Sequence, residues 1–481
     1  MRVTTEQQRN RIVADLLKDL AEDNLAIFAG AGLSAPAGFV SWPELLRPIA
    51  EELELDVDRE TDLVSLAQYH CNSNLANRGK LNQLLIDELS EKAEVTENHR
   101  ILARLPISTY WTTNYDKLIE CALNDASKTP DVKHRIKQLN ITKRGRDAVV
   151  YKMHGDIDHP DEAVLTKDDY EAYHVKMLPF ITALSGDLVS KTFLFLGFSF
   201  TDPNLDYILS RVRVAYSTDQ RQHYCIQKMI EAEEGESQAD TDYRKRKQEL
   251  FIQDLLRFGI KTIIVSNYSE ITDILRRLEW AYRRRTIFLS GAAHEYGRWK
   301  SEDAEDFIYS LSKEIAALGF RIVSGFGLGV GSSVITGVLE HVYMNGKRLD
   351  SDQLILRPFP QPEVGSRPIS EVWHEYRTDM ISYAGIAIFL FGNKIINSEV
   401  VCSDGLVKEF EIAKSNGLLL LPVGATEYAS REIYTKLIQE GYFESLDFPR
   451  SMKVHIDKLG DDSSDLSTIK EALISLLKSL E

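Results

Sequence analysis

Residues 26–34 read Ala26-Ile27-Phe28-Ala29-Gly30-Ala31-Gly32-Leu33-Ser34. A short apolar run ends in glycines and a serine, and a helical pattern resumes around Trp42. This order is typical of a strand, a tight turn and a helix. Glycine lets a phosphate approach the backbone closely, and a helix N-terminus offers free N–H groups to an anion. Because an ordinary βα turn has the same pattern, this motif alone is weak evidence for a nucleotide site.

The composition predicts a globular, cytoplasmic protein of two or three domains. The chain has 481 residues and a net charge of −16, which argues against non-specific binding to nucleic acid or to an anionic membrane. No signal peptide and no apolar run of membrane-spanning length is found. None of the four cysteines lies in a C-x-x-C pair, so the sequence predicts no zinc module and no metal site; they are Cys71, Cys121, Cys225 and Cys402.

The first half of the chain alternates strand-like and helical patterns. An amphipathic helix is predicted over residues 5–23 and a first strand over 25–31. Residues 43–105 are mostly helical, and such an insertion after the first turn could cap a pocket. Further short apolar runs, rich in β-branched and aromatic residues, predict strands at 108–113, 148–153, 192–199 and 260–266. The alternation predicts an α/β domain with a parallel sheet.

Polar residues follow three of these predicted strands. They form the groups Thr113-Asn114-Tyr115-Asp116, His154-Gly155-Asp156 and Gly197-Phe198-Ser199, the last leading to Asp202 and Asn204. Ligands bind beyond the carboxyl ends of strands in open parallel sheets, so one shared cleft is predicted. Within it, Asn114 could bond a ribose hydroxyl or position a water, and His154 could act as a general base. Taken singly, each of the two residues is more often structural.

A second α/β pattern begins after the basic cluster at 283–285. Strands are predicted at 286–290, 321–324, 354–356, 386–391 and 418–423, with helices between them. The prediction is therefore two doubly wound, Rossmann-like parallel-sheet domains, residues 1–283 and 284–481, the first with a helical insertion. The second domain's strand ends carry Ser290-Gly291-Ala292, the glycine-rich stretch 325–331 and Arg357-Pro358-Phe359-Pro360. Alternating glycines favour a backbone nest for phosphate, and thus a second nucleotide-sized cleft.

Four motifs of the first half, in order and spacing, resemble those of the sirtuin family. The glycine turn with Ser34 resembles its opening motif, and the groups at 113–116, 153–155 and 197–199 resemble its Gln-Asn-Ile-Asp, Leu-His-Gly and Gly-Thr-Ser motifs. Two family features are absent: the four-cysteine zinc module, and a Phe-Arg pair where Phe39-Val40-Ser41-Trp42 stands. Both help to frame the acyl-lysine groove of deacylating sirtuins. The resemblance therefore implies water, rather than acyl-lysine, as the acceptor of ADP-ribose.

The second half resembles the SLOG superfamily, whose members bind nucleotide-derived ligands. A sirtuin-like domain followed by a SLOG domain is the architecture of the effectors of bacterial Thoeris anti-phage defence. The resemblance implies an NAD+ hydrolase that releases nicotinamide and ADP-ribose and so depletes NAD during infection. It also implies activation by a cyclic ADP-ribose isomer, made by a TIR-domain partner protein and bound by the SLOG domain. A homo-oligomer, either a tetramer or a filament, is implied as well.

Site residues follow from the resemblance, motif by motif. His154 would be the catalytic base and Asn114 its partner. The NAD-binding residues would be Gly30, Ala31, Gly32, Ser34, Asn114, Asp116, His154, Gly197 and Ser199. In the SLOG domain, Arg377 and Lys394 would meet the phosphates of the signal and Glu409 a ribose, although the residues alone favour solvated surface positions for Arg377 and Lys394. The remaining signal-binding residues would be Gly291, Ala292, Leu328, Phe359 and Gly405.

Three functions remain open at this point. Nucleotide-hydrolysing SLOG proteins have a longer Gly-Gly-x-Gly-Thr segment, and residues 327–331 depart from it, which favours sensing over catalysis in the second domain. The alternatives to NAD+ hydrolysis are an NAD-dependent protein deacylase and a non-catalytic nucleotide-sensing scaffold. The missing zinc module disfavours the deacylase, and the pair of His154 and Asn114 disfavours the scaffold.

Overall fold

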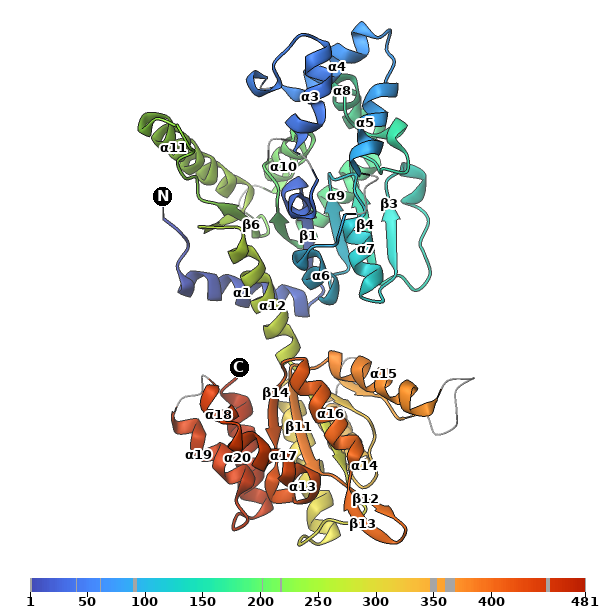
Figure 1. Cartoon of the computed structure of the whole chain (residues 1–481), viewed down its shortest axis with the longest axis vertical. Coiled ribbons are helices and arrows are strands. Elements are labelled where there is room, and N and C mark those ends of the chain that lie inside the picture. The colour runs from blue at the N-terminus through green and yellow to red at the C-terminus, as the bar shows by residue number, and fades with distance from the viewer. Residues whose placement is uncertain are drawn as a thin grey trace. The chain divides into compact units, whose positions relative to one another are not determined.

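The computed structural model is an α/β protein with two compact units, residues 1–279 and 280–481 (Figure 1). It describes residues 2–39, 41–60, 62–89, 93–200, 202–216, 219–346, 353–359, 368–446 and 450–480. Val40 and Pro360, which belong to stretches quoted above, lie outside these residues. Each unit contains a parallel sheet, of seven and five strands respectively, so the predicted fold class is confirmed.

The first sheet has the strand order β3-β4-β2-β1-β5-β6-β7, and every neighbouring pair is parallel. The central strand β1 pairs with β2 on one side, Ala26 facing Thr109, and with β5 on the other, Ala26 facing Phe193. The order in which strands are added to the sheet thus reverses at β1. At such a point a crevice opens at the carboxyl ends of the central strands. The strands are β1 (Leu25–Ala29), β2 (Thr109–Thr112), β3 (Pro130–Lys133), β4 (Ala148–Lys152), β5 (Thr192–Leu196), β6 (His223–Lys228) and β7 (Ile260–Val265).

Helices surround this sheet, and four described α-helices fall in the stretch predicted as a helical insertion, residues 43–105. Of these, α3 (Trp42–Glu52), α4 (Leu63–Ser73) and α5 (Gly79–Leu89) share an apolar core and lie together at the top of Figure 1. The first helix, α1 (Glu6–Ala21), begins with a capping box at Thr5, which fixes its start. The others are α2 (Ala31–Ser34), α6 (Glu97–Arg104), α7 (Leu118–Asp125), α8 (Lys167–Lys176), α9 (Leu178–Ser190), α10 (Pro203–Tyr216), α11 (Gln238–Leu255) and α12 (Ser269–Arg284).

The sequence pattern does not predict strands β3 and β6, and both have a physical reason. Strand β3 lies at the sheet edge and begins with Pro130, a residue that edge strands tolerate. Its buried Asp131 and Lys133 pair with each other at 2.7 Å, so two charges replace an apolar run. Strand β6 is an inner strand, but polar residues flank its apolar centre, Tyr224–Ile226, on both sides.

The second unit contains a five-stranded parallel sheet in the order β10-β9-β8-β11-β14. These strands are β8 (Thr286–Ala292), β9 (Arg321–Ser324), β10 (Leu354–Leu356), β11 (Ile386–Phe391) and β14 (Leu419–Pro422). An antiparallel hairpin of β12 (Asn393–Ile396) and β13 (Glu399–Cys402) is not predicted, because polar and charged residues interrupt its short apolar runs. The helices are α13 (Ser301–Ala317), α14 (Gly331–Met344), α15 (Ile369–Ser382), α16 (Asp404–Ser415), α17 (Tyr428–Gln439), α18 (Tyr442–Ser445), α19 (Arg450–Gly460) and α20 (Leu466–Lys478).

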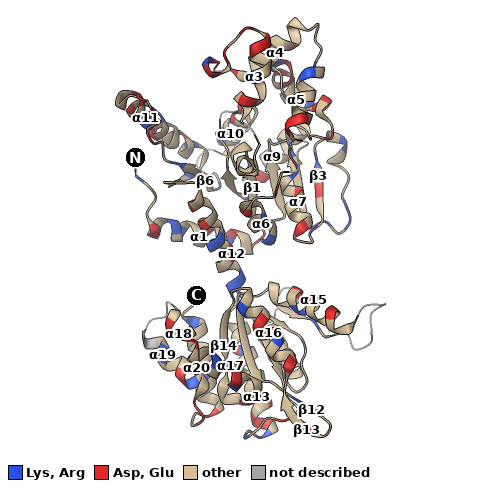
Figure 2. Ribbon diagram, in the orientation of Figure 1, with Lys and Arg blue, Asp and Glu red and all other residues tan. Residues whose placement is uncertain are grey.

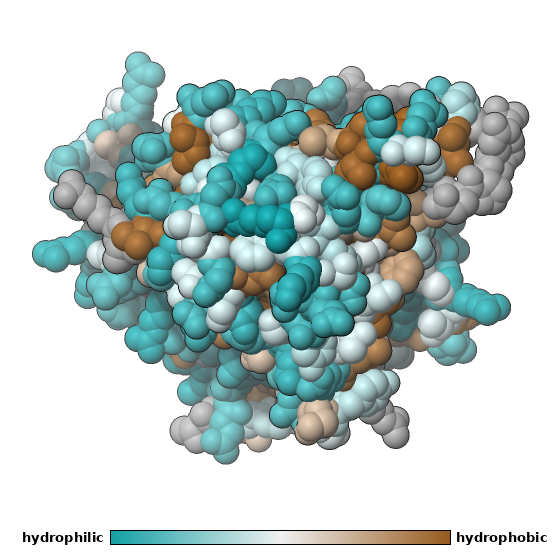
Figure 3. All heavy atoms as spheres, turned by 90° about the horizontal axis from the view of Figure 1, so that it is seen from below, coloured by the Kyte–Doolittle hydropathy of each residue, from teal (hydrophilic) through white to brown (hydrophobic). Residues whose placement is uncertain are grey.

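The two compact units divide between Glu279 and Trp280, within helix α12. The sequence places the domain boundary at residues 283/284, the last turn of this helix, because the charged cluster there precedes the first strand of the new pattern. Basic and acidic residues are intermingled along the helices of each unit (Figure 2). From below, hydrophobic side chains form separate areas among hydrophilic ones (Figure 3).

Within the described ranges, every helix is too short or too polar to cross a lipid bilayer.

Candidate functional site

A cavity of about 640 Å³ lies at the carboxyl ends of strands β1, β2, β4 and β5. Its size is within the usual range for pockets that bind small molecules and cofactors. Of the nine predicted NAD-binding residues, Gly30 does not line this cavity, although its carbonyl oxygen accepts a hydrogen bond from Asn114. The structure brings the other eight predicted residues to this one cavity: Ala31, Gly32, Ser34, Asn114, Asp116, His154, Gly197 and Ser199.

The glycines of the first turn allow two loops to pack against each other. A Cβ atom on Gly30 would lie 2.4 Å from the carbonyl oxygen of Gly197, and one on Gly197 would lie 2.0 Å from the nitrogen of Leu33. Gly197 also has φ +61°, where side chains are disfavoured. The N–H group of Gly32 donates to the Gly197 carbonyl at 2.9 Å. Close packing of the loops thus accounts for these glycines, and the Gly32 N–H is already paired.

Asn114 joins the loop after β2 to the glycine turn. Its Nδ2 donates to the carbonyl oxygen of Gly30 at 3.1 Å and to the Oγ of Ser34 at 3.0 Å. Its backbone N–H donates to the Oγ1 of Thr112 at 2.9 Å. Because both amide protons have acceptors, the amide oxygen is the group that Asn114 can offer to a ligand or a water. This buried side chain therefore both fixes the turn and faces the cavity.

His154 follows β4 and is 4% exposed, yet it lines the cavity. Its Nε2 lies 3.2 Å from the Oδ2 of Asp202, although no hydrogen bond to this buried nitrogen is aligned. The rings of Tyr170 and Tyr173 lie edge-on to the imidazole, at centroid distances of 5.5 and 6.1 Å. Burial lowers the pKa of His154 below its ordinary value, and the Asp202 carboxylate opposes part of this shift. The imidazole is therefore neutral near pH 7, the form a general base requires.

A fully buried lysine behind the site is a residue that the sequence motifs do not reveal. The Nζ of Lys152 donates to the carbonyl oxygens of Tyr115 and Asp116 at 3.0 and 2.6 Å. It pairs with Asp156 at 2.6 Å and Glu120 at 3.2 Å. Burial disfavours its charge, but the two carboxylates outweigh this and raise the pKa of Lys152. Lys152 thus stabilises the loop after β2, which carries Asn114, through two of its backbone carbonyl groups.

Replacement of Lys152 by methionine is expected to lower the free energy of unfolding by about 3–5 kcal/mol, because Asp156 and Glu120 would be left as unpaired buried charges. Urea unfolding followed by tryptophan fluorescence measures this difference. Lys137→Met, at an exposed position, is the matched control and should change the value by less than about 0.5 kcal/mol. Equal unfolding curves for the two variants would show that the buried cluster is not structural.

The predicted helical insertion supplies an apolar wall of the cavity. The described lining contains carboxylates, but no lysine or arginine: the carboxylates are Asp62, Glu88, Asp116 and Asp202. Negative charge around a cavity favours a ligand that carries a cationic group. The apolar wall described first consists of Phe39, Trp42, Leu45, Leu63, Val64, Leu85 and Leu89.

In the second unit, the predicted signal residues Arg377 and Glu409 lie in contact and largely buried. The Nε of Arg377 is 3.4 Å from the Oε1 of Glu409, and its guanidinium lies 4.8 Å from the centre of the Phe359 ring. Ser290 donates to the other oxygen of Glu409 at 2.6 Å. Burial raises the pKa of Glu409, which Ser290 and Arg377 oppose. Arg377 is only 9% exposed, so the solvated position favoured by the residues alone is wrong for this side chain.

The other predicted signal residues lie on the loops around this pair. Gly405, at the start of α16, would place a Cβ atom 3.2 Å from a guanidinium nitrogen of Arg377. Lys394 in the hairpin forms a partly exposed ion pair with Asp404. Leu328 is exposed, and its carbonyl accepts from Ala293, next to Gly291 and Ala292. A Cβ atom on Gly327 would lie 1.9 Å from the Gly291 carbonyl oxygen, so close loop packing accounts for this glycine too.

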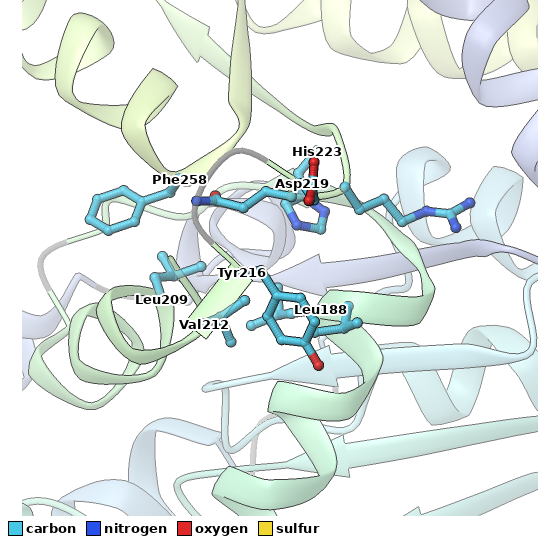
Figure 4. Close-up of a pocket in the computed structure, with 10 residues that line it drawn as sticks. Leu188, Leu209, Val212, Tyr216, Asp219, His223 and Phe258 are labelled. Atoms are coloured by element: carbon cyan, nitrogen blue, oxygen red, sulfur yellow. The ribbon is translucent and has the colours of Figure 1, made fainter. Parts of the chain in front are cut away.

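A second, much smaller cavity of about 20 Å³ lies at the amino ends of β5, β6 and β7 (Figure 4). Leu188, Leu209 and Phe258 line it together with His223, whose Nδ1 accepts from the N–H of Phe193 at 3.1 Å. It has room for about one water and none for a nucleotide. In the part of the chain that the structure describes, no group of three or more histidine, cysteine, aspartate or glutamate side chains is placed to hold a metal ion.

Two family models match the two halves of the chain. One, described as a SIR2-like domain, matches residues 108–252. The other, described as the Sir2- and TIR-associating SLOG family, matches residues 270–480. The resemblance of the first half to sirtuins and of the second to SLOG proteins is thereby confirmed.

Full-length relatives come from several bacteria, and each covers nearly the whole chain. A protein from Bacillus cereus strain MSX-D12 is 56% identical over 98% of this chain and 97% of its own length. One from Acinetobacter baumannii strain 532279 is 48% identical over 90% and 91%, and one from Cytobacillus dafuensis is 48% identical over 98% and 96%. All three relatives are named NAD(+) hydrolase ThsA.

Proposed function

Since the chain belongs to the ThsA family of NAD(+) hydrolases, we propose that it cleaves NAD+ into nicotinamide and ADP-ribose in the cavity of the first unit. The observation that carries this proposal is the meeting of His154, Asn114 and the glycine turn in one cavity at the carboxyl ends of the sheet. NAD+ is the substrate, and no metal is needed. The carboxylates of the lining suit its cationic nicotinamide ring.

Cleavage of the nicotinamide–ribose bond passes through an oxocarbenium-like state, as other glycosidic cleavages do. Nicotinamide leaves as a neutral molecule, so the protein need not supply an acid. Its tasks are to hold the ribose, exclude bulk water and admit one water molecule. His154 accepts a proton from that water or from a ribose hydroxyl, and the amide oxygen of Asn114 orients one of them. The apolar wall of the insertion serves the exclusion of water.

Water as the acceptor distinguishes this proposal from protein deacylation. We expect nicotinamide release from NAD+ to proceed at the same rate with and without an acetyl-lysine peptide. In H₂¹⁸O, one ¹⁸O atom should enter each ADP-ribose, as measured by mass spectrometry. Release that requires the peptide, or that forms an acetylated ADP-ribose, would instead assign the chain to the deacylases. The four described cysteines are free and scattered, which supports hydrolysis over a zinc-containing deacylase.

For the second unit we propose a sensing role. A cyclic ADP-ribose isomer, made by a TIR-domain partner protein, binds among Arg377, Lys394, Glu409 and Phe359 and activates the first unit. The match to a Sir2- and TIR-associating SLOG family supports a nucleotide ligand and a TIR-domain partner. Coupling between two sites requires two global states with different affinities for the signal. A homo-oligomer, a tetramer or a filament in the cytoplasm, is the proposed assembly, and depletion of NAD+ during phage infection the proposed outcome.

A non-catalytic scaffold is the remaining alternative. It predicts that NAD+ and a cyclic ADP-ribose isomer bind without any release of nicotinamide. The buried, neutral His154 beside a carboxylate disfavours a purely structural role for this cavity.

A further inference from the structure

We propose that Asp202 is the positioning residue for His154: its carboxylate orients the imidazole and stabilises the imidazolium that forms when His154 accepts a proton. This inference rests on the proposed NAD+ hydrolysis and adds a residue to it. The sirtuin-like motifs do not assign this role to Asp202, which lies beyond the Gly197-Phe198-Ser199 group.

The fold holds Asp202 in place from several sides. Asp202 immediately precedes helix α10, and its Oδ1 accepts from the backbone N–H of Leu205 at 3.0 Å, as an N-cap residue does. The other oxygen, Oδ2, lies 3.2 Å from the Nε2 of His154 and accepts from the hydroxyl of Tyr170 at 3.4 Å. One carboxylate therefore caps a helix with one oxygen and faces the imidazole with the other. Because each oxygen has a different neighbour, the orientation of the Asp202 carboxylate is fixed.

The imidazole needs such a partner because it is buried. Its Nε2 is solvent-inaccessible and has no aligned hydrogen bond, so Asp202 is the acceptor that a small rotation of the ring would reach. The other titratable groups facing it are the phenols of Tyr170 and Tyr173, both on α8. The hydroxyl of Tyr173 is already bonded to the carbonyl of Met153 at 3.1 Å. A cation formed at this place without a carboxylate would be strongly disfavoured.

The proton transfer balances with groups named above. The oxygen of a water molecule bonds to C1′ of the ribose as the C1′–nitrogen bond breaks, and that electron pair leaves with nicotinamide. The proton of the water passes to the imidazole, and the imidazolium later releases it to solvent. The Asp202 carboxylate lowers the free energy of the cationic form, as the carboxylate beside a catalytic histidine does in other hydrolases.

Substitution of Asp202 by asparagine or by serine tests this role. Both residues are good N-caps, so each retains an acceptor for the Leu205 N–H while removing the charge. We expect kcat for cleavage of 1,N6-etheno-NAD+ at pH 7.5 to fall at least about tenfold. Since the carboxylate raises the pKa of His154, its removal should move the acidic limb of the kcat profile to lower pH. The ratio of the wild-type kcat to the variant kcat should therefore decrease as the pH falls.

Asp206→Asn is the matched control, because Asp206 is an exposed carboxylate of the same helix and makes no contact with His154. It should leave both kcat and the acidic limb unchanged. The profiles are measured on the full chain over pH 4.5–8.5, with cyclic ADP-ribose isomers added where turnover requires them. An unshifted limb in either folded Asp202 variant, or an equal shift in the control, would overturn the positioning role. Absence of turnover in the wild type under all conditions would instead overturn the proposed NAD+ hydrolysis.

Discussion

Replacement of His154 by alanine is expected to lower the rate of nicotinamide release from NAD+ by about 10²–10⁴-fold, the usual contribution of a general base. The reason is geometric: His154 is the neutral, buried imidazole that lines the cavity formed by the ends of β1, β2, β4 and β5. When His154 is truncated, the Asp202 carboxylate beside it keeps its hydrogen bonds from the Leu205 N–H and the Tyr170 hydroxyl. The fold should therefore survive, and chromatography of nicotinamide gives the rate.

The matched control for this variant is His174→Ala, since His174 is an exposed histidine on α8. It should retain the wild-type rate. Circular dichroism and the melting temperature establish that both variants are folded. A folded His154→Ala protein with the wild-type rate would remove His154 from the mechanism.

Asn114→Ala extends the same test to the other side of the cavity. The variant loses two hydrogen bonds to the glycine turn, to Gly30 and Ser34, as well as the amide oxygen that can face the ribose. We expect nicotinamide release to be lost while the protein stays folded. Retained activity in both Asn114→Ala and His154→Ala would mean that the reaction occurs elsewhere.

Arg377→Ala is expected to abolish activation by the cyclic ADP-ribose isomer and to weaken its binding by about 10–150-fold, which corresponds to the loss of a charged hydrogen bond of about 1.5–3 kcal/mol. Arg377 is held in a buried position by Glu409 and the ring of Phe359. A planar guanidinium can bind two phosphate oxygens at once. Calorimetric titration of the full chain measures binding, and nicotinamide release measures activation.

Two further variants separate signal binding from damage to the fold. Arg377→Lys keeps the charge opposite Glu409 but loses the forked geometry, so binding should weaken while the melting temperature changes little. Lys414→Ala, on the helix that carries Glu409, removes an exposed ion pair with Glu440 and should bind the signal normally. Full activation of Arg377→Ala would exclude this residue from the signal site.

The sequence predicts the position of the candidate active site better than its detail. His154 and Asn114 each follow an apolar strand, and the rule that ligands bind at carboxyl ends places them together. The glycine turn is recognisable as a turn, but its loop partner Gly197 comes from a strand more than 160 residues further on, and only the paired strands β1 and β5 reveal it. Strand β3 cannot be recognised from the sequence pattern, because its buried residues are charges that pair with each other and not an apolar run.

Charged residues that act in the interior are the hardest to predict. Lys152 follows a run of apolar residues and would be expected at the surface, yet it is buried by four polar contacts that come from the loop after β2, from α7 and from Asp156. Likewise, the sequence pattern places Arg377 in a helix but does not reveal that it pairs with Glu409, which lies on another helix. Pairing across the fold depends on tertiary contacts, which local periodicity does not contain.

Hydrolysis of NAD+ in the cavity of the first unit can be tested with a single product assay. The purified full chain is incubated with NAD+, with and without a series of cyclic ADP-ribose isomers, and nicotinamide and ADP-ribose are quantified by chromatography. We predict equal amounts of the two products, formed faster with one of the isomers and about 10²–10⁴-fold more slowly by His154→Ala. Binding of NAD+ without release of nicotinamide under every condition would contradict hydrolysis in this cavity.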